Sequence, residues 1–214
     1  MRIAIPLFDR LTALDGVGPY EVLQRLPGAT VHFVGEEVGE VRTENGFLGL
    51  TVDMTYDEIP DPDVIVVPGG IGTRAFTDGG DHALVDWVRS AHETTAFTTS
   101  VCTGSLVLAA AGLLDGLEAT THWGSYADLE ALGAKPTGTR VVEHLDQRII
   151  TAAGVSSGID MALRLSELLV DDVAAKAMQL MVEYDPQPPF DAGAVEKAGD
   201  EVMTRVIEYA ADKA

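Results

Sequence analysis

The run Asp63-Val64-Ile65-Val66-Val67-Pro68-Gly69-Gly70 constrains the fold of this chain more than any other segment. Its four central residues are apolar and β-branched, so neither face of a strand built from them is polar. A strand of this kind is typical of a parallel sheet that is covered by helices on both faces. The proline and the two glycines predict that the strand ends in a loop.

The remaining chain alternates between strand-like and helical segments, as such a sheet requires. Further strands are expected at residues 2–8, 30–34, 95–101, 119–122, 140–145 and 148–152, with a hairpin within 38–52. Helices are expected at residues 18–26, 81–92, 103–112, 125–132, 159–169, 173–184 and 194–211. The sequence predicts an α/β fold with a mostly parallel sheet, in one domain that spans residues 1–214.

Composition limits the compartment and the partners. No apolar run approaches the ~20 residues of a membrane span, the start resembles a first strand rather than a signal peptide, and one cysteine excludes an internal disulfide. We therefore expect a cytoplasmic protein without a membrane partner.

The formal net charge is −20, with only four lysines, so no basic footprint for nucleic acid exists. An acidic, lysine-poor surface is typical either of an ordinary soluble protein or of a halophilic one, because concentrated salt screens its repulsion.

Cys102 is the first candidate for chemistry. The β-branched strand 95–101 runs into it, and a segment of small residues that begins Thr103-Gly104-Ser105 follows it. Such a turn resembles a nucleophile elbow, which exposes a side chain above the carboxyl edge of the sheet. The N-terminus of the next helix is expected to stabilise the thiolate and lower the thiol pKa. The competing interpretation is a buried, inert thiol.

Two further segments are candidates for the same cleft. The amides of Gly70 and Ile71 follow the buried strand, and we expect them to face Cys102 and hold a developing negative charge, although an ordinary glycine turn is the alternative. Asp15 either caps the first helix or points into the cleft. In the cleft, burial and a neighbouring thiolate would raise its pKa, so that it holds a proton near neutral pH as a general acid does.

His122 and Trp123 end a short predicted strand, Ala119 to His122. His122 either assists Cys102 or is a structural histidine, and Trp123 is a candidate for the wall of the substrate pocket. No histidine or cysteine pair has metal-ligand spacing, so no metal site is predicted.

These residues resemble the ThiJ/PfpI superfamily, which has the class I glutamine amidotransferase-like fold. The segments that carry the resemblance are Leu14-Asp15, Gly18-Pro19-Tyr20-Glu21-Val22-Leu23, Val67-Pro68-Gly69-Gly70, Ser100-Val101-Cys102-Thr103-Gly104-Ser105, Ala119-Thr120-Thr121-His122-Trp123 and Gly158-Ile159-Asp160. Within the superfamily the chain most resembles isonitrile (isocyanide) hydratases, through residues 102–114 and the tail 183–190. The resemblance covers nearly the whole chain.

The resemblance implies a flavodoxin-like three-layer sandwich, a homodimer and no cofactor. For a hydratase it implies that Cys102 attacks the terminal carbon of a small electrophilic substrate, an isonitrile, while Asp15 supplies a proton and Thr103 helps to position it. The thioimidate that forms is hydrolysed to an N-substituted formamide. A soft thiolate suits a soft electrophilic carbon, so this chemistry agrees with the residues themselves.

Departures and alternatives stay open at this point. Ala152-Ala153-Gly154 stands where the resembling hydratases have a glycine run, which bears on turnover and on substrate size. Thr103 replaces the histidine that PfpI-type peptidases carry after the nucleophile, and Asp15 stands where glyoxalase and deglycase relatives typically have glutamate. The alternatives are a glyoxalase-like or deglycase-like enzyme, a redox or stress protein that senses oxidants through Cys102, and a regulatory ligand-binding domain.

Overall fold

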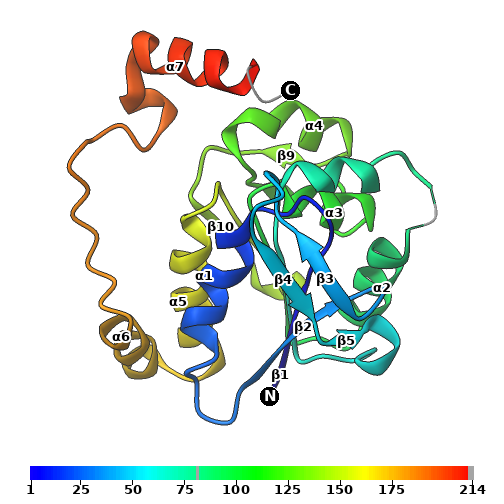
Figure 1. Cartoon of the computed structure of the whole chain (residues 1–214). Helices are drawn as coiled ribbons and strands as arrows, with labels where there is room; N and C mark the ends of the chain where they lie inside the picture. Colours follow the sequence, from blue (N-terminus) through cyan, green and yellow to red (C-terminus); the bar gives the residue numbers. More distant parts are fainter. Residues whose placement is uncertain (81, 212–214) are drawn as a thin grey trace. The chain divides into compact units, whose positions relative to one another are not determined.

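The computed structural model describes residues 1–80 and 82–211, and seven strands of these residues form one sheet (Figure 1). The strand order is β10-β11-β7-β6-β1-β2-β5, and all neighbours are parallel except β10 and β11. The strands of this sheet are β1 (Arg2–Pro6), β2 (Thr30–Gly35), β5 (Met54–Thr55), β6 (Val64–Val67), β7 (Phe97–Val101), β10 (Val141–His144) and β11 (Ile149–Ala152). Every residue of β6 is buried, which confirms the prediction from its apolar sequence.

Helices cover both faces of the sheet (Figure 1). On one side α1, α5 and α6 pack against one another, and on the other α2 and α3 are in contact. The helices are α1 (Ala13–Leu23), α2 (Ala83–His92), α3 (Gly104–Ala110), α4 (Tyr126–Ala131), α5 (Ser157–Leu169), α6 (Asp172–Met181) and α7 (Val195–Ala211). The predicted α/β sandwich with a mostly parallel sheet is therefore confirmed.

Short elements complete the connections. The expected hairpin is present as β3 (Gly39–Arg42) paired antiparallel with β4 (Gly49–Val52), and a small parallel pair joins β8 (Glu118–Ala119) to β9 (Lys135–Pro136). The 3-10 turns are η1 (Tyr56–Glu58), η2 (Ile71–Phe76), η3 (Trp123–Ser125) and η4 (Leu145–Gln147).

The first helix differs from its prediction in a way that matters for the site. It begins at Ala13 rather than at Gly18, although glycine and proline are poor helix formers. A Cβ added at Gly16 would lie 3.6 Å from Ile5, and one at Gly18 would lie 3.2 Å from Ile159. The glycines therefore let α1 approach β1 and α5 closely, and this packing outweighs their low helix propensity. The early start places Asp15 in the first turn of the helix.

Other boundaries also moved: the strand expected at 95–101 begins at Phe97, and the helix expected at 173–184 ends at Met181. The strand expected at 119–122 covers only Glu118–Ala119, because Thr120 N–H donates to the Thr151 side chain at 3.0 Å instead of continuing a ladder. The helix expected from Asp81 begins at Ala83, and Asp81 itself lies outside the described residues.

The described chain divides into two units, residues 1–182 and residues 183–211. The first contains the sheet, the hairpin and helices α1 to α6. The second contains α7, which is interrupted at Gly199 by a left-handed backbone angle, φ 73°. Over the described residues, no helix combines the length and the apolar character that crossing a membrane requires.

Candidate active site

The carboxyl ends of three adjacent strands meet at one edge of the sheet. Val67 of β6 pairs with Ser100 of β7, and Ala152 of β11 pairs with Val101. The residues that follow these strands therefore emerge side by side. In a parallel sheet this edge is where ligands bind.

Cys102 leaves β7 in the strained conformation that the elbow requires. Its φ is 57°, in the left-handed region that residues with a side chain rarely adopt. Its N–H donates to the carbonyls of Ala152 and Ala153 at 3.0 and 2.9 Å, while its carbonyl accepts the hydroxyls of Ser105 and Thr121, both at 3.1 Å. These bonds fix the turn from both sides. They also show Ala153, the departure from the hydratase pattern, directly behind the nucleophile.

Asp15 points into the same site, which resolves the two interpretations of this residue. The N-cap of α1 is Thr12, and Asp15 sits inside the first turn with 0% of its surface exposed. Its Oδ2 accepts a hydrogen bond from Gly69 N–H at 2.9 Å, and the carboxyl interacts with the thiol of Cys102. Its Oδ1 is buried and has no hydrogen-bond partner among the described residues.

Burial changes the acid–base character of this carboxyl. Desolvation raises the pKa of Asp15 to about 7, against the lowering effects of the Gly69 amide and the Cys102 thiol. The negative charge of Glu44 adds a smaller upward shift. Asp15 can therefore gain or lose a proton near neutral pH, as the sequence predicted for a carboxyl in the cleft.

The prediction for the thiol itself was wrong. Burial and then the charge of Asp15 raise the pKa of Cys102 to about 12, whereas the sequence predicted a lowered pKa. The amides of Val155 and Thr103 do act on the sulfur and lower the pKa, but their effect is smaller than the loss of water around a side chain that is only 4% exposed. A thiolate therefore forms in this site only when a neighbouring group accepts the proton of the thiol.

The amides predicted to hold a developing charge are engaged elsewhere. Gly70 N–H donates to Thr103 Oγ1 at 2.8 Å, and Ile71 N–H donates to Glu44 Oε1 at 3.0 Å. The role of Gly70 and Ile71 as the oxyanion site therefore stays a prediction, and it requires that these hydrogen bonds be exchanged for bonds to the substrate. No local sequence pattern indicated that hairpin residue Glu44 reaches Ile71 at this edge.

Thr103 and Val155 supply the amides that approach the sulfur. Thr103 also ties the loop together, because its hydroxyl accepts from Gly70 N–H and donates to Gly70 O at 3.1 Å. Val155 has a φ of 38°, an unfavourable angle for a β-branched residue. Sequence analysis missed Val155 because its contribution is a backbone amide, which any residue type can provide.

Gly69 is required by the closeness of these groups. A Cβ at this position would lie 2.5 Å from Thr103 N and 2.8 Å from Asp15 Oδ2. Both distances are well below a van der Waals contact, so a side chain would displace Asp15, Thr103 or both.

His122 and Trp123 lie at the border of the site. The half-buried His122 accepts a hydrogen bond from Gly124 N–H at 3.2 Å through Nδ1, and desolvation lowers its pKa. Its ring lies 5.1 Å from that of Trp123, which is 39% exposed. Within the described residues no hydrogen bond joins His122 to Cys102, so the geometry favours the structural interpretation of this histidine.

Sequence comparison places this geometry in a family. Residues 1–168 match the DJ-1/PfpI family. The chain belongs to that family. The family match covers the sheet, the elbow and all the site residues described above.

Three relatives show how far the similarity extends. The isonitrile hydratase of Pseudomonas putida is 42% identical over 211 residues, which cover 99% of this chain and 90% of that protein. The crystal structure of a ThiJ/PfpI family protein from Pseudomonas syringae has a TM-score of 0.90 at 37% identity, covering 99% of this chain and 86% of that one. The transcriptional regulator CdhR of Pseudomonas aeruginosa is 30% identical, over 76% of this chain but only 48% of its own length.

Proposed function

We propose that this DJ-1/PfpI protein is an isonitrile hydratase, a cysteine-dependent hydro-lyase that converts isonitriles to N-substituted formamides. The observation that carries the proposal is the buried pair of Asp15 and Cys102, in which a carboxyl with a pKa of about 7 lies against the thiol. The 42% identity to an isonitrile hydratase over nearly the whole chain supports the same function.

The first step uses the single proton that this pair holds above pH 7. Asp15 accepts the thiol proton as Cys102 Sγ forms a bond to the terminal carbon of the isonitrile, and the protonated carboxyl then donates that proton to the same carbon. The product is a thioimidate, R–N=CH–S–Cys102, and no atom is lost. The Thr103 and Val155 amides stabilise negative charge on the sulfur during the transfer.

The second step consumes one water. Its oxygen bonds to the thioimidate carbon while Asp15 carries the water proton toward the nitrogen, giving a tetrahedral intermediate. The C–S bond then breaks, the hydroxyl becomes the formyl carbonyl, and its proton returns to the sulfur. The net reaction is R–NC plus water to R–NH–CHO, so no redox partner or cofactor is needed.

The test is formamide production from an aromatic isonitrile, with the wild type beside Cys102→Ala and Cys102→Ser. We expect loss of turnover in Cys102→Ala and a trapped mass increase equal to one isonitrile on the wild-type protein early in the reaction. Residual turnover in the folded Cys102→Ala variant would contradict the proposal. Wild-type consumption of methylglyoxal without consumption of isonitrile would favour the glyoxalase-like alternative.

The same geometry weighs against the redox-sensing alternative. Peroxide reacts with an exposed thiolate, whereas the Cys102 side chain is buried and its pKa is raised. We expect Cys102 to oxidise more slowly than a free thiol under mild peroxide. Rapid, stoichiometric conversion to sulfinate would support the sensor.

The proposal extends to the setting of the enzyme. We propose a homodimer in the cytoplasm of an organism with high internal salt, in which residues 1–214 act as one domain, and a small molecule as the only substrate partner. The net charge of −20 with four lysines supports the high-salt setting. Light scattering tests the dimer, and unfolding in 0.1 M and 2 M KCl tests the salt dependence, for which we expect higher stability at 2 M.

A further inference from the structure

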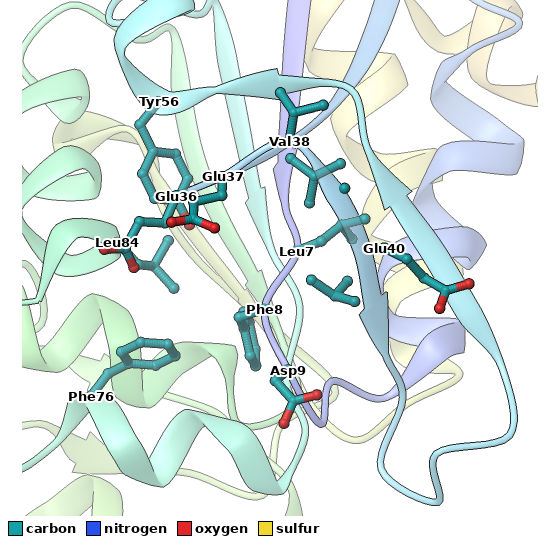
Figure 2. A pocket seen from close by; sticks show the side chains of 13 residues that line it. Leu7, Phe8, Asp9, Glu36, Glu37, Val38, Glu40, Tyr56, Phe76 and Leu84 are labelled. Carbon is teal, nitrogen blue, oxygen red and sulfur yellow. The ribbon is translucent and has the colours of Figure 1, made fainter.

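A cavity lies between the β3–β4 hairpin and the elements η1, η2 and α2 (Figure 2). Its volume is about 470 Å³, in the range of small-molecule sites. It shares no lining residue with the Asp15–Cys102 site. The lining residues are Leu7, Phe8, Asp9, Glu36, Glu37, Val38, Gly39, Glu40, Val41, Val52, Tyr56, Phe76 and Leu84.

The inner wall of the cavity is apolar and aromatic. Leu7, Phe8 and Leu84 are all less than a tenth exposed, and the rings of Phe8 and Phe76 meet edge to face at 5.4 Å. A wall of this composition favours a hydrocarbon or aromatic ligand body, which would displace water from apolar surface.

The rim carries the opposite chemistry. Asp9, Glu36, Glu37 and Glu40 line it, and no lysine, arginine or histidine does. Glu40 forms an ion pair with Arg42 at 2.6 Å, whereas the other three carboxylates have no ion pair or side-chain hydrogen bond within residues 1–80 and 82–211. Their charges add to a field that attracts a cation into the cavity.

Tyr56 adds an independent reason to expect a polar ligand. The residue is 8% exposed and its ring stacks on Trp87 at 4.9 Å, while its side chain extends toward Glu36 (Figure 2). In the described part of the chain its hydroxyl has no hydrogen-bond partner. Its oxygen is not fully buried, so it is open to the cavity that Tyr56 lines. A ligand that fills the cavity would remove this hydroxyl from water, which costs free energy unless the ligand supplies a hydrogen bond. A ligand N–H placed between Tyr56 and Glu36 would supply it.

We propose that this cavity binds a small organic cation, namely a primary ammonium group attached to an aryl or alkyl body. The ammonium donates to Tyr56 and to the carboxylates of Glu36 and Glu37, and the body occupies the wall formed by Phe8, Phe76 and Leu84. This site is separate from the proposed isonitrile chemistry, whose substrate is neutral, and its failure or success does not depend on that chemistry.

The experiment uses three probes to separate the contribution of the ammonium charge from that of the aromatic group. Titration calorimetry of the full chain compares 2-phenylethylammonium, which has both features, with methylammonium and 2-phenylethanol, which each have one. We expect 2-phenylethylammonium to bind at least about tenfold more tightly than either. Amide shifts in NMR spectra are expected at Tyr56 and Phe76 rather than around Cys102. Equal binding of the three probes, or shifts centred on Cys102, would overturn the proposal.

Variants test the named side chains. The double change Glu36→Gln and Glu37→Gln removes two negative charges from exposed side chains and keeps their size. We expect it to weaken the binding of 2-phenylethylammonium about tenfold and to leave the binding of 2-phenylethanol unchanged. Tyr56→Phe is expected to weaken the same probe about threefold. Glu130→Gln, an exposed change on α4, controls for the general attraction of an acidic protein. The proposal fails if Glu130→Gln weakens binding as much as the double change.

Discussion

Asp15 and Glu36 carry the same carboxyl group in opposite surroundings. Asp15 is fully buried beside a thiol, and burial raises its pKa to about 7. Glu36 is exposed at the rim of a cavity, where it contributes to an acidic field. The comparison teaches that desolvation turns Asp15 into a proton carrier near neutral pH, whereas Glu36 acts through its position, as one of several acidic side chains that line a cavity. Net charge alone distinguishes neither role.

The sharpest way to break this comparison is Asp15→Asn. The amide keeps the size of the side chain but cannot accept the thiol proton, so we expect kcat/KM for an isonitrile to fall about 10³-fold or more. Formamide release measured by chromatography checks the loss. Glu130→Gln removes an exposed carboxyl, in contrast to the buried one of Asp15, and is expected to keep wild-type turnover. Activity of Asp15→Asn within tenfold of the wild type would remove Asp15 from the mechanism.

Gly69→Ala tests how tightly the buried carboxyl must be held. The added methyl would lie 2.8 Å from Asp15 Oδ2 and 2.5 Å from Thr103 N, so we expect about a 10²-fold loss of kcat/KM through misplacement of the proton carrier. Gly193→Ala is the matched control, because a Cβ there meets nothing within 4 Å. Circular dichroism establishes that both variants fold. Unchanged kinetics in Gly69→Ala would show that the close packing is not needed for activity.

Sequence patterns predicted the fold well because its central strands are continuous apolar or β-branched runs. The apolar run at Val64–Val67 and the β-branched run before Cys102 specify buried neighbouring strands, and both are found as β6 and β7. Helix α1 was placed too late, because its glycines depress helix propensity while permitting close packing. The separation of Glu183 onward from the first unit was not foreseen, because Pro186, Pro188 and Pro189 indicate a break between helices but do not by themselves show a separate unit.

The site was predictable where its signal is local. Cys102 was found from its own flanking residues, but the role of Asp15 stayed open because its approach to residue 102 depends on the whole sheet. Glu44 and Val155 were missed, since one arrives on a hairpin and the other contributes only a backbone amide. The shift of the Cys102 thiol pKa was predicted in the wrong direction. Burial dominates this shift, and the degree of burial cannot be derived from neighbours in sequence.

Stability against pH sharpens the comparison without any substrate. A carboxyl whose pKa is raised in the folded state holds a proton that the unfolded chain releases, so folding stability is lost as pH rises from about 4 toward 7. Between pH 5 and pH 8 we expect the wild type to lose ~2 kcal/mol of unfolding free energy relative to Asp15→Asn. Urea unfolding of both proteins at the two pH values measures the difference. Parallel pH dependences would mean that Asp15 ionises as an ordinary exposed carboxyl does.

The pH dependence of turnover gives the smallest effect and links it to the mechanism. Below pH 7 Asp15 and Cys102 both hold protons, so Asp15 cannot accept the thiol proton; above pH 7 the pair holds one proton and reacts. We therefore expect kcat/KM for an isonitrile to rise about tenfold from pH 6 to pH 8, with an inflection near 7. Initial rates in constant-ionic-strength buffers measure this profile. The inflection should vanish in Asp15→Asn, where whatever slow turnover remains has no group that titrates in this range. A wild-type rate that falls across the same interval would show instead that the doubly protonated pair is the reactive form, and that the buried carboxyl acts only as an acid.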